Sequence, residues 1–195
     1  MPKLLLHACC AVCASYPVLQ LKEMGYEVIL YFYNPNIYPK EEYKRRLEEL
    51  KKLSERYNVK LIIEETSYDY WLELIKGLEK EPEKGKRCSV CFKERLSKAV
   101  QAAIKEKCDY FTTTLTVSPH KNSKQIFEAA YSVCNSDIIN NLPLQTTNES
   151  TAIQNLKFLE IDFKKRDGFK KTSKLADEYG FYRQKHCGCK FSIRE

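Results

Sequence analysis

The chain opens with Lys3-Leu4-Leu5-Leu6-His7-Ala8-Cys9-Cys10-Ala11-Val12-Cys13, a short apolar run that leads directly into three closely spaced cysteines. Residues 4–6 predict a buried strand, because a brief apolar run bounded by polar residues is typical of a sheet interior. A helix is expected after Cys13, with Ser15 as its N-cap, Pro17 in its first turn and Gly25 at its end. A strand, a turn and a helix make the first half of a βαβ unit.

The same alternation continues along the chain. Apolar, β-branched and aromatic runs predict further strands at residues 27–33, 59–63, 110–115 and 156–161. Amphipathic spacing predicts helices at residues 41–57, 92–105, 123–133 and 173–179, and another around Trp71 with Ser67 as its cap. The polar stretch 135–150 is expected to be a loop. This alternation predicts one α/β domain over residues 1–195, with a Rossmann-like, mostly parallel sheet covered by helices on both faces.

Composition narrows the class of protein. The 195 residues include 33 Lys+Arg and 26 Asp+Glu, a net charge of +7, and 43% are hydrophobic. These values are typical of a folded soluble protein and exclude a disordered tail or a fibre. No apolar run approaches the roughly 20 residues of a membrane-spanning helix, and the three leucines before His7 are too few for an export signal. We therefore expect a cytoplasmic protein that binds no membrane.

Nine cysteines form the main chemical signal. They are too few for a disulfide scaffold, and in a reducing compartment clustered cysteines more often bind metal or carry out redox chemistry. Two intervening residues allow both thiolates to reach one metal, as in zinc and iron–sulfur sites. Three groups occur, with Cys108 and Cys134 expected to be buried bystanders: Cys9-Cys10-x-x-Cys13, Cys88-x-x-Cys91 and Cys187-Gly188-Cys189.

The positions of the first two groups favour a working cluster. Cys9 and Cys10 follow the first predicted strand, while residues 34–36 and 116–122 follow the second and fourth. Ligands of parallel α/β sheets bind beyond these carboxyl ends, so the loops can converge on one site. Lys84, Lys86 and Arg87 precede Cys88 and would favour its thiolate form. A structural zinc knuckle is the alternative.

The third group has a different spacing. A disulfide between Cys187 and Cys189 would close a small strained ring, and strain makes a disulfide easy to reduce. The pair therefore suits a dithiol that passes two electrons, although both thiols could instead bind metal. His186, directly before the pair, could move protons, whereas His7 is expected to be a packed core residue.

Two further features concern partners. None of the six glycines has the spacing of a phosphate-binding loop, so we expect no tightly bound nucleotide cofactor such as ATP or NAD. Residues 164–190 carry nine Lys/Arg and three Asp/Glu, interleaved with Phe169, Tyr179, Phe181 and Tyr182. Basic groups neutralise phosphates and aromatic rings stack on unpaired bases, so the basic C-terminal segment 164–195 predicts RNA binding. A solvated basic helix face is the alternative.

The combined motifs resemble the cobalamin-independent epoxyqueuosine reductases, the QueH family, over nearly the whole chain. His186 and Phe169 stand where tyrosine is expected in that family. The motifs are His7-Ala8-Cys9-Cys10-Ala11-Val12-Cys13, Tyr33-Asn34-Pro35-Asn36-Ile37 with Glu42-Tyr43, Tyr68-Asp69, Arg87-Cys88-x-x-Cys91, Phe111-Thr112-Thr113-Thr114-Leu115 with Ser118-Pro119-His120-Lys121-Asn122, Asp162-Phe163-Lys164-Lys165, and Tyr182-Arg183-Gln184 with Cys187-Gly188-Cys189.

The resemblance implies a fold like that of the adenine-nucleotide α-hydrolases with the nucleotide loop replaced, an iron–sulfur cluster, and tRNA as substrate. The implied reaction reduces epoxyqueuosine to queuosine at the wobble position of tRNA, the last step of queuosine formation. It consumes two electrons and two protons, and an external donor would supply the electrons.

Roles for residues follow from this resemblance as hypotheses. Cys9, Cys10, Cys88 and Cys91 would hold a 4Fe–4S cluster, and Cys187 and Cys189 would cycle between dithiol and disulfide. The sequence leaves open whether Cys13 replaces one ligand and whether a mononuclear iron lies beside the cluster. Candidate proton donors are Asp69, His120 and His186, and candidate phosphate contacts are Lys164, Lys165, Arg166, Lys170 and Lys171. The alternatives are a tRNA-binding protein with structural zinc and a sulfur-transferring tRNA enzyme, which would need ATP.

Overall fold

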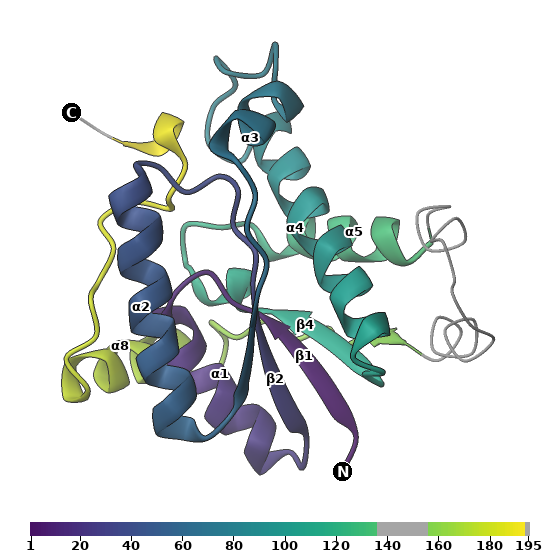
Figure 1. Ribbon diagram of the computed structural model, residues 1–195, viewed down its shortest axis with the longest axis vertical. Coiled ribbons are helices and arrows are strands. Elements are labelled where there is room, and N and C mark those ends of the chain that lie inside the picture. The colour runs from purple at the N-terminus through teal and green to yellow at the C-terminus, as the bar shows by residue number, and fades with distance from the viewer. Residues whose placement is uncertain (136–155, 194–195) are drawn as a thin grey trace.

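The computed structural model describes residues 1–135 and 156–193 (Figure 1). Five parallel strands form one sheet in the order β3-β2-β1-β4-β5, which confirms the predicted α/β class. The strands are β1 Lys3–His7, β2 Glu27–Phe32, β3 Lys60–Ile63, β4 Tyr110–Thr113 and β5 Lys157–Phe158. The helices are α1 Ala11–Glu23, α2 Lys40–Tyr57, α3 Tyr68–Leu74, α4 Lys86–Lys105, α5 Ser123–Cys134 and α8 Gly168–Glu178, with 3₁₀ turns η1 Thr114–Val117 and η2 Lys190–Ser192.

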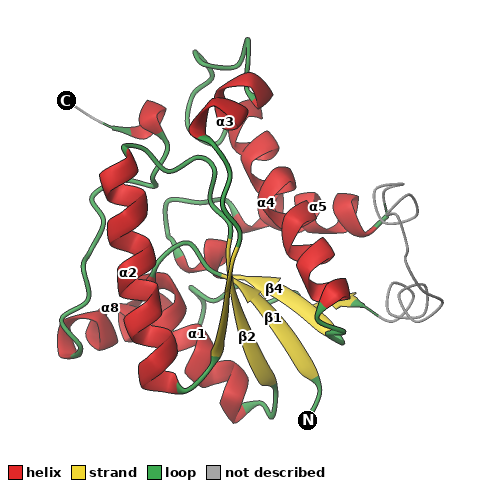
Figure 2. Ribbon diagram, viewed as in Figure 1, coloured by secondary structure: helices red, strands yellow, loops and turns green. Residues whose placement is uncertain are grey.

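Alternating side chains of the strands build two cores, one on each face of the sheet. Figure 2 shows the helices that lie on the two sides of the sheet. Leu4 and Leu6 of β1 pack with apolar residues of α1, α2 and α8. Leu5 points to the other face, where α4 and α5 cover it. The central strand is therefore apolar on both faces, as expected for a parallel sheet between two helical layers.

The order of the strands determines where a site can form. Strand β1 pairs with β2 on one side and with β4 on the other, so the chain leaves β1 and β4 in opposite directions. A crevice opens where the order reverses, beyond the carboxyl ends of these two strands. The residues at that position are Ala8, Cys9 and Cys10 after β1 and the turn η1 after β4.

Several predicted boundaries were wrong. Helix α1 begins at Ala11 with Cys10 as its N-cap, and Ser15 lies inside the helix, where its hydroxyl donates to the carbonyl of Val12. Helix α4 begins at Lys86 rather than at residue 92, so Cys88 and Cys91 lie in its first two turns. Apolar periodicity could not reveal this start because the first turn is polar and basic.

Other elements match the expectations more closely. Ser67 caps α3 through a hydrogen bond from the backbone N–H of Tyr70, as predicted. The predicted loop at residues 135–150 lies outside the described residues from residue 136 onward. In residues 1–135 and 156–193, no helix is both long and apolar enough to cross a bilayer.

Candidate active site

A cavity of about 700 Å³ lies beyond the carboxyl ends of β1 and β4. Its lining combines residues of the β1–α1 turn, the start of α4 and the C-terminal segment after α8, three stretches that are distant in the sequence. Six cysteines take part: Cys9, Cys13, Cys88, Cys91, Cys187 and Cys189. All nine cysteines of the chain are free thiols. The sequence groups therefore meet around one space.

The first group forms a thiol trio of Cys9, Cys10 and Cys13, whose sulfur atoms lie within 4.8 Å of one another. The Cys9 and Cys10 sulfurs are 3.8 Å apart, and the backbone N–H of Cys13 donates to the Cys10 sulfur at 3.3 Å. Cys10 thus caps α1 with its sulfur, at the helix end whose dipole favours a thiolate. The trio follows from the backbone geometry of the first helical turn.

The trio has an uneven charge distribution. Hydrogen bonds from the thiols of Cys10 and Cys13 lower the pKa of Cys9 well below its usual value. A hydrogen bond from Cys13 lowers the pKa of Cys10. The hydrogen bond of Cys10 to Cys9 and the burial of Cys10 outweigh that effect, so the pKa of Cys10 rises to about 12. Hydrogen bonding to Cys10 and Cys9 raises the pKa of Cys13. The hydrogen bonds among the three buried sulfurs therefore favour the thiolate at Cys9, and the thiolate is the form of cysteine that binds metal.

Other side chains hold the trio in place. The hydroxyl of Thr114, in η1, lies 3.4 Å from the backbone nitrogen of Cys9 and 3.8 Å from its sulfur. The side-chain amide of Gln184 donates to the sulfurs of Cys10 and Cys13 at 3.2 and 3.6 Å. The trio is therefore held from the turn η1 and from the C-terminal segment at once.

The second group lies in α4. The backbone N–H of Lys84 donates to the Cys88 sulfur at 3.3 Å, and burial raises the pKa of both Cys88 and Cys91. Cys91 packs with Trp71 and Cys189. Among the described residues, Cys9, Cys10 and Cys13 are the one set of three or more potential ligands close enough to share an ion. Cys88 and Cys91 line the same cavity without belonging to that set.

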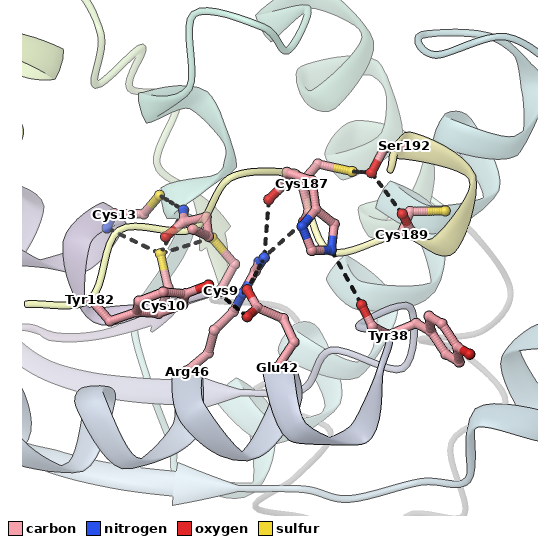
Figure 3. Close-up of polar contacts among 12 residues, drawn as sticks. Cys9, Cys10, Cys13, Tyr38, Glu42, Arg46, Tyr182, Cys187, Cys189 and Ser192 are labelled. Carbon is pink, nitrogen blue, oxygen red and sulfur yellow. Dashed lines mark hydrogen bonds and ion pairs between the residues drawn. The ribbon is translucent and has the colours of Figure 1, made fainter. Parts of the chain in front are cut away.

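The third group is the dithiol of Cys187 and Cys189. The Cys187 thiol donates to the hydroxyl of Ser192 at 3.1 Å, and this hydroxyl donates to the carbonyl of Cys189 at 2.7 Å (Figure 3). Burial raises the pKa of Cys189 to about 12, so this thiol is held protonated.

Two buried arginines beside the cysteines were missed in the sequence. Arg95 is 2% exposed and donates to the side-chain oxygen of Asn34, to His7 Nε2 and, at 3.8 Å, to the Cys91 sulfur. Arg46 is 1% exposed and donates to backbone carbonyls of the dithiol segment. Each interrupts the apolar stripe of its helix, at a position where a charge requires buried partners. A basic residue within the apolar stripe was therefore the signal in the sequence that could have identified each buried arginine.

Comparisons with known proteins identify the family. The sequence profile of epoxyqueuosine reductase QueH matches residues 4–195. The chain belongs to this family. The QueH enzyme of Streptococcus pyogenes is 35% identical over 99% of this chain and 71% of its own length, and that of Dehalococcoides mccartyi is 32% identical over 100% and 94%. The solved U34-tRNA thiolase NcsA from Methanococcus maripaludis, with its [4Fe-4S] cluster, shares the fold at a TM-score of 0.58, with 16% identity over 99% of this chain and 61% of that structure.

This QueH chain places the candidate proton donors differently. His120 and His186 line the cavity, whereas Asp69 lies in the first turn of α3, exposed and outside the lining. His7 is fully buried, with ring nitrogens 2.9 Å from the Thr113 hydroxyl and 3.2 Å from the Tyr33 carbonyl. Burial lowers its pKa to about 3, so it is neutral, which confirms a packed core histidine.

The aromatic residues of the basic segment were only partly available for stacking. Tyr179 and Phe181 pack edge to face against each other, and Tyr179 also contacts Tyr57 in the core. Phe169, by contrast, is 46% exposed and lines the cavity. Of the four aromatic residues between Lys164 and Lys190, Phe169 in α8 is therefore the one that lines the cavity, and its neighbours Lys170 and Lys171 are exposed.

Proposed function

We propose that this chain is an epoxyqueuosine reductase that converts epoxyqueuosine to queuosine at the wobble position of tRNA. The observation that carries the proposal is the meeting of six cysteines from three distant segments on one cavity, in a chain of the QueH family. Reduction of the epoxide to an alkene consumes two electrons and two protons and releases water. A cavity that combines metal-ligating thiols with a dithiol is chemically suited to that demand.

The donor set fits an iron–sulfur cluster. We infer that Cys9, Cys10, Cys88 and Cys91 hold a 4Fe–4S cluster, because thiolates are the ligands such clusters require. When bound, the cluster supplies electron transfer and a Lewis-acidic iron. Cys13 brings the nearby thiols to five, one more than the cluster needs. The thiol left over can replace one of the four ligands or hold an adjacent mononuclear iron.

The dithiol supplies the stoichiometry of the reaction. Oxidation of Cys187 and Cys189 to a disulfide releases two electrons and two protons, the amounts that the epoxide consumes. An external electron donor then reduces the disulfide for the next cycle. His120 and His186 are the candidates to pass a proton to the departing oxygen, since both line the cavity.

The substrate tRNA would meet the protein at α8 and the loop before it. Phe169 offers its ring to a base at the cavity, while Lys165, Arg166, Lys170 and Lys171 are exposed and can contact phosphates. Lys164 is partly engaged already, since its ammonium group donates to the carbonyl of Lys121. Free thiols throughout the chain suit a reducing compartment, and we propose a cytoplasmic location.

Anaerobic purification followed by an assay on tRNA containing epoxyqueuosine tests the proposal. We expect a brown protein containing iron and sulfide, and queuosine in the nucleoside digest after addition of a reductant. Cys88→Ser and Cys91→Ser should lose iron, whereas Cys134→Ser, at the end of α5, serves as the control. A colourless protein with zinc and no iron would contradict the proposal. ATP-dependent incorporation of sulfur into tRNA would replace it with a thiolase.

A further inference from the structure

The C-terminal segment runs alongside α2 on its way to the cavity, and Arg46 of α2 contacts it there (Figure 3). The guanidinium group donates from Nη1 to the carbonyl of Cys187 at 3.2 Å and from Nη2 to the carbonyl of His186 at 3.0 Å. Both contacts are to backbone, directly before Gly188. Arg46 therefore holds the backbone of the chain beside the dithiol.

Arg46 is itself held in position by Glu42, one helical turn earlier. Arg46 Nε donates to Glu42 Oε1 at 2.7 Å, and Nη2 forms an ion pair with the same oxygen at 2.7 Å. The other carboxylate oxygen accepts from the Tyr182 hydroxyl at 2.9 Å. Glu42 is 8% exposed, so this ion pair is shielded from solvent. The two side chains thus contact the C-terminal segment twice, at Tyr182 and at residues 186–187.

The loop before α2 adds a second attachment. The backbone N–H of Tyr38 donates to the carbonyl of Gly188 at 2.8 Å, and the carbonyl of Tyr38 lies 3.2 Å from His186 Nε2. Gly188 has φ +107°, and a Cβ there would lie 3.1 Å from Arg46 Nη1. The segment is therefore seated closely against the start of α2, although residues 181–189 contain no helix or strand.

From these contacts we infer that Arg46, oriented by Glu42, is a positioning residue that fixes the Cys187–Cys189 dithiol at the cavity. The inference rests on the proposed function for its catalytic consequence, but the positioning itself can be measured without substrate. Arginine suits this role because its planar group sends donors in three directions at once, to Glu42 and to two successive carbonyls. Lysine keeps the charge but cannot make these three contacts together.

The experiment measures the exposure of the dithiol in the holoenzyme. Wild type, Arg46→Gln and Arg46→Lys are treated anaerobically with iodoacetamide, and peptide mass spectrometry follows the alkylation of Cys187 and Cys189. Arg56→Gln is the matched control, since Arg56 lies in the last turn of α2 and covers the ring of Tyr179. We expect both Arg46 variants to raise the alkylation rate at least tenfold and to lower kcat at least tenfold. The KM for tRNA and the iron content of the Arg46 variants should stay at wild-type values. The alkylation rate and kcat of Arg56→Gln should also match those of the wild type.

The possible outcomes distinguish the positioning role of Arg46 from the proposed reductase activity. Alkylation rates of the Arg46 variants within twofold of wild type would overturn the inference, even if turnover fell. Faster alkylation in an enzyme with no activity on epoxyqueuosine would retain the positioning role and reject the proposed function. If the Arg46 variants do not fold, Tyr182→Phe removes only the hydroxyl that contacts Glu42. It should raise the alkylation rate two- to fivefold, and an unchanged rate would equally overturn the inference.

Discussion

Gly188→Ala is the substitution whose effect can be worked out most directly from the structure. At φ +107° an L-residue carries a backbone penalty of about 1–2 kcal/mol. The new Cβ would lie 3.1 Å from both Arg46 Nη1 and Ile37 Cγ1, and both neighbours are buried. Displacing Arg46 by a few tenths of an ångström would weaken its bonds to the segment, at a cost of about 1 kcal/mol.

The two effects together destabilise by about 2–3 kcal/mol the docked state, in which residues 186–188 are bonded to Arg46 and Tyr38. This free energy corresponds to a decrease of roughly 30- to 150-fold in the ratio of docked to undocked molecules. We expect kcat to fall by up to this factor, because kcat follows the docked fraction, and alkylation of Cys187 to accelerate, with little change in iron content. Gly25→Ala is the control, since Gly25 has φ +88° and open space around its Cβ position. It carries the same backbone penalty far from the cavity. A Gly188→Ala enzyme that turned over as fast as Gly25→Ala would refute the reasoning.

Three further predictions concern other parts of the site. Trp71 is fully buried against Cys91 and Cys189, so Trp71→Ala should lower the free energy of unfolding by about 3–5 kcal/mol in denaturant titrations, and Trp71→Phe should cost less. Phe169→Ala should raise KM for tRNA by roughly 5- to 150-fold, the value of about 1–3 kcal/mol for one stacked base, while leaving thermal stability unchanged; an unaltered KM would exclude stacking. Arg95→Gln should make the midpoint potential of the bound cluster more negative, because a buried positive charge beside the Cys91 sulfur is lost. A redox titration followed by electron paramagnetic resonance measures this potential, and an unchanged value would argue against this role of Arg95.

The architecture was predictable because its signals are local. Each buried strand is an apolar run, and each long helix has an apolar stripe of helical period, so strand and helix order could be read directly. The place of the site then followed from topology, since residues after β1 and β4 must lie at the carboxyl edge of the sheet.

The finer structure of the site was less predictable because sulfur takes unusual roles there. Cys10 caps α1 in place of an oxygen-bearing residue, so the N-cap lies five residues before the expected Ser15. The start of α4 has basic residues and cysteines where periodicity gives no signal. Composition also could not separate Phe169, which faces the cavity, from Phe181, which belongs to the core.

Gln184 and Cys187 stand only three positions apart on one stretch of chain, yet the first touches the trio and the second belongs to the dithiol. Three residues of extended chain span at most about 11 Å. One short peptide segment therefore contacts both sulfur centres, the trio through the side chain of Gln184 and the dithiol through Cys187 itself. A displacement of this segment at one sulfur centre therefore shifts its contacts at the other.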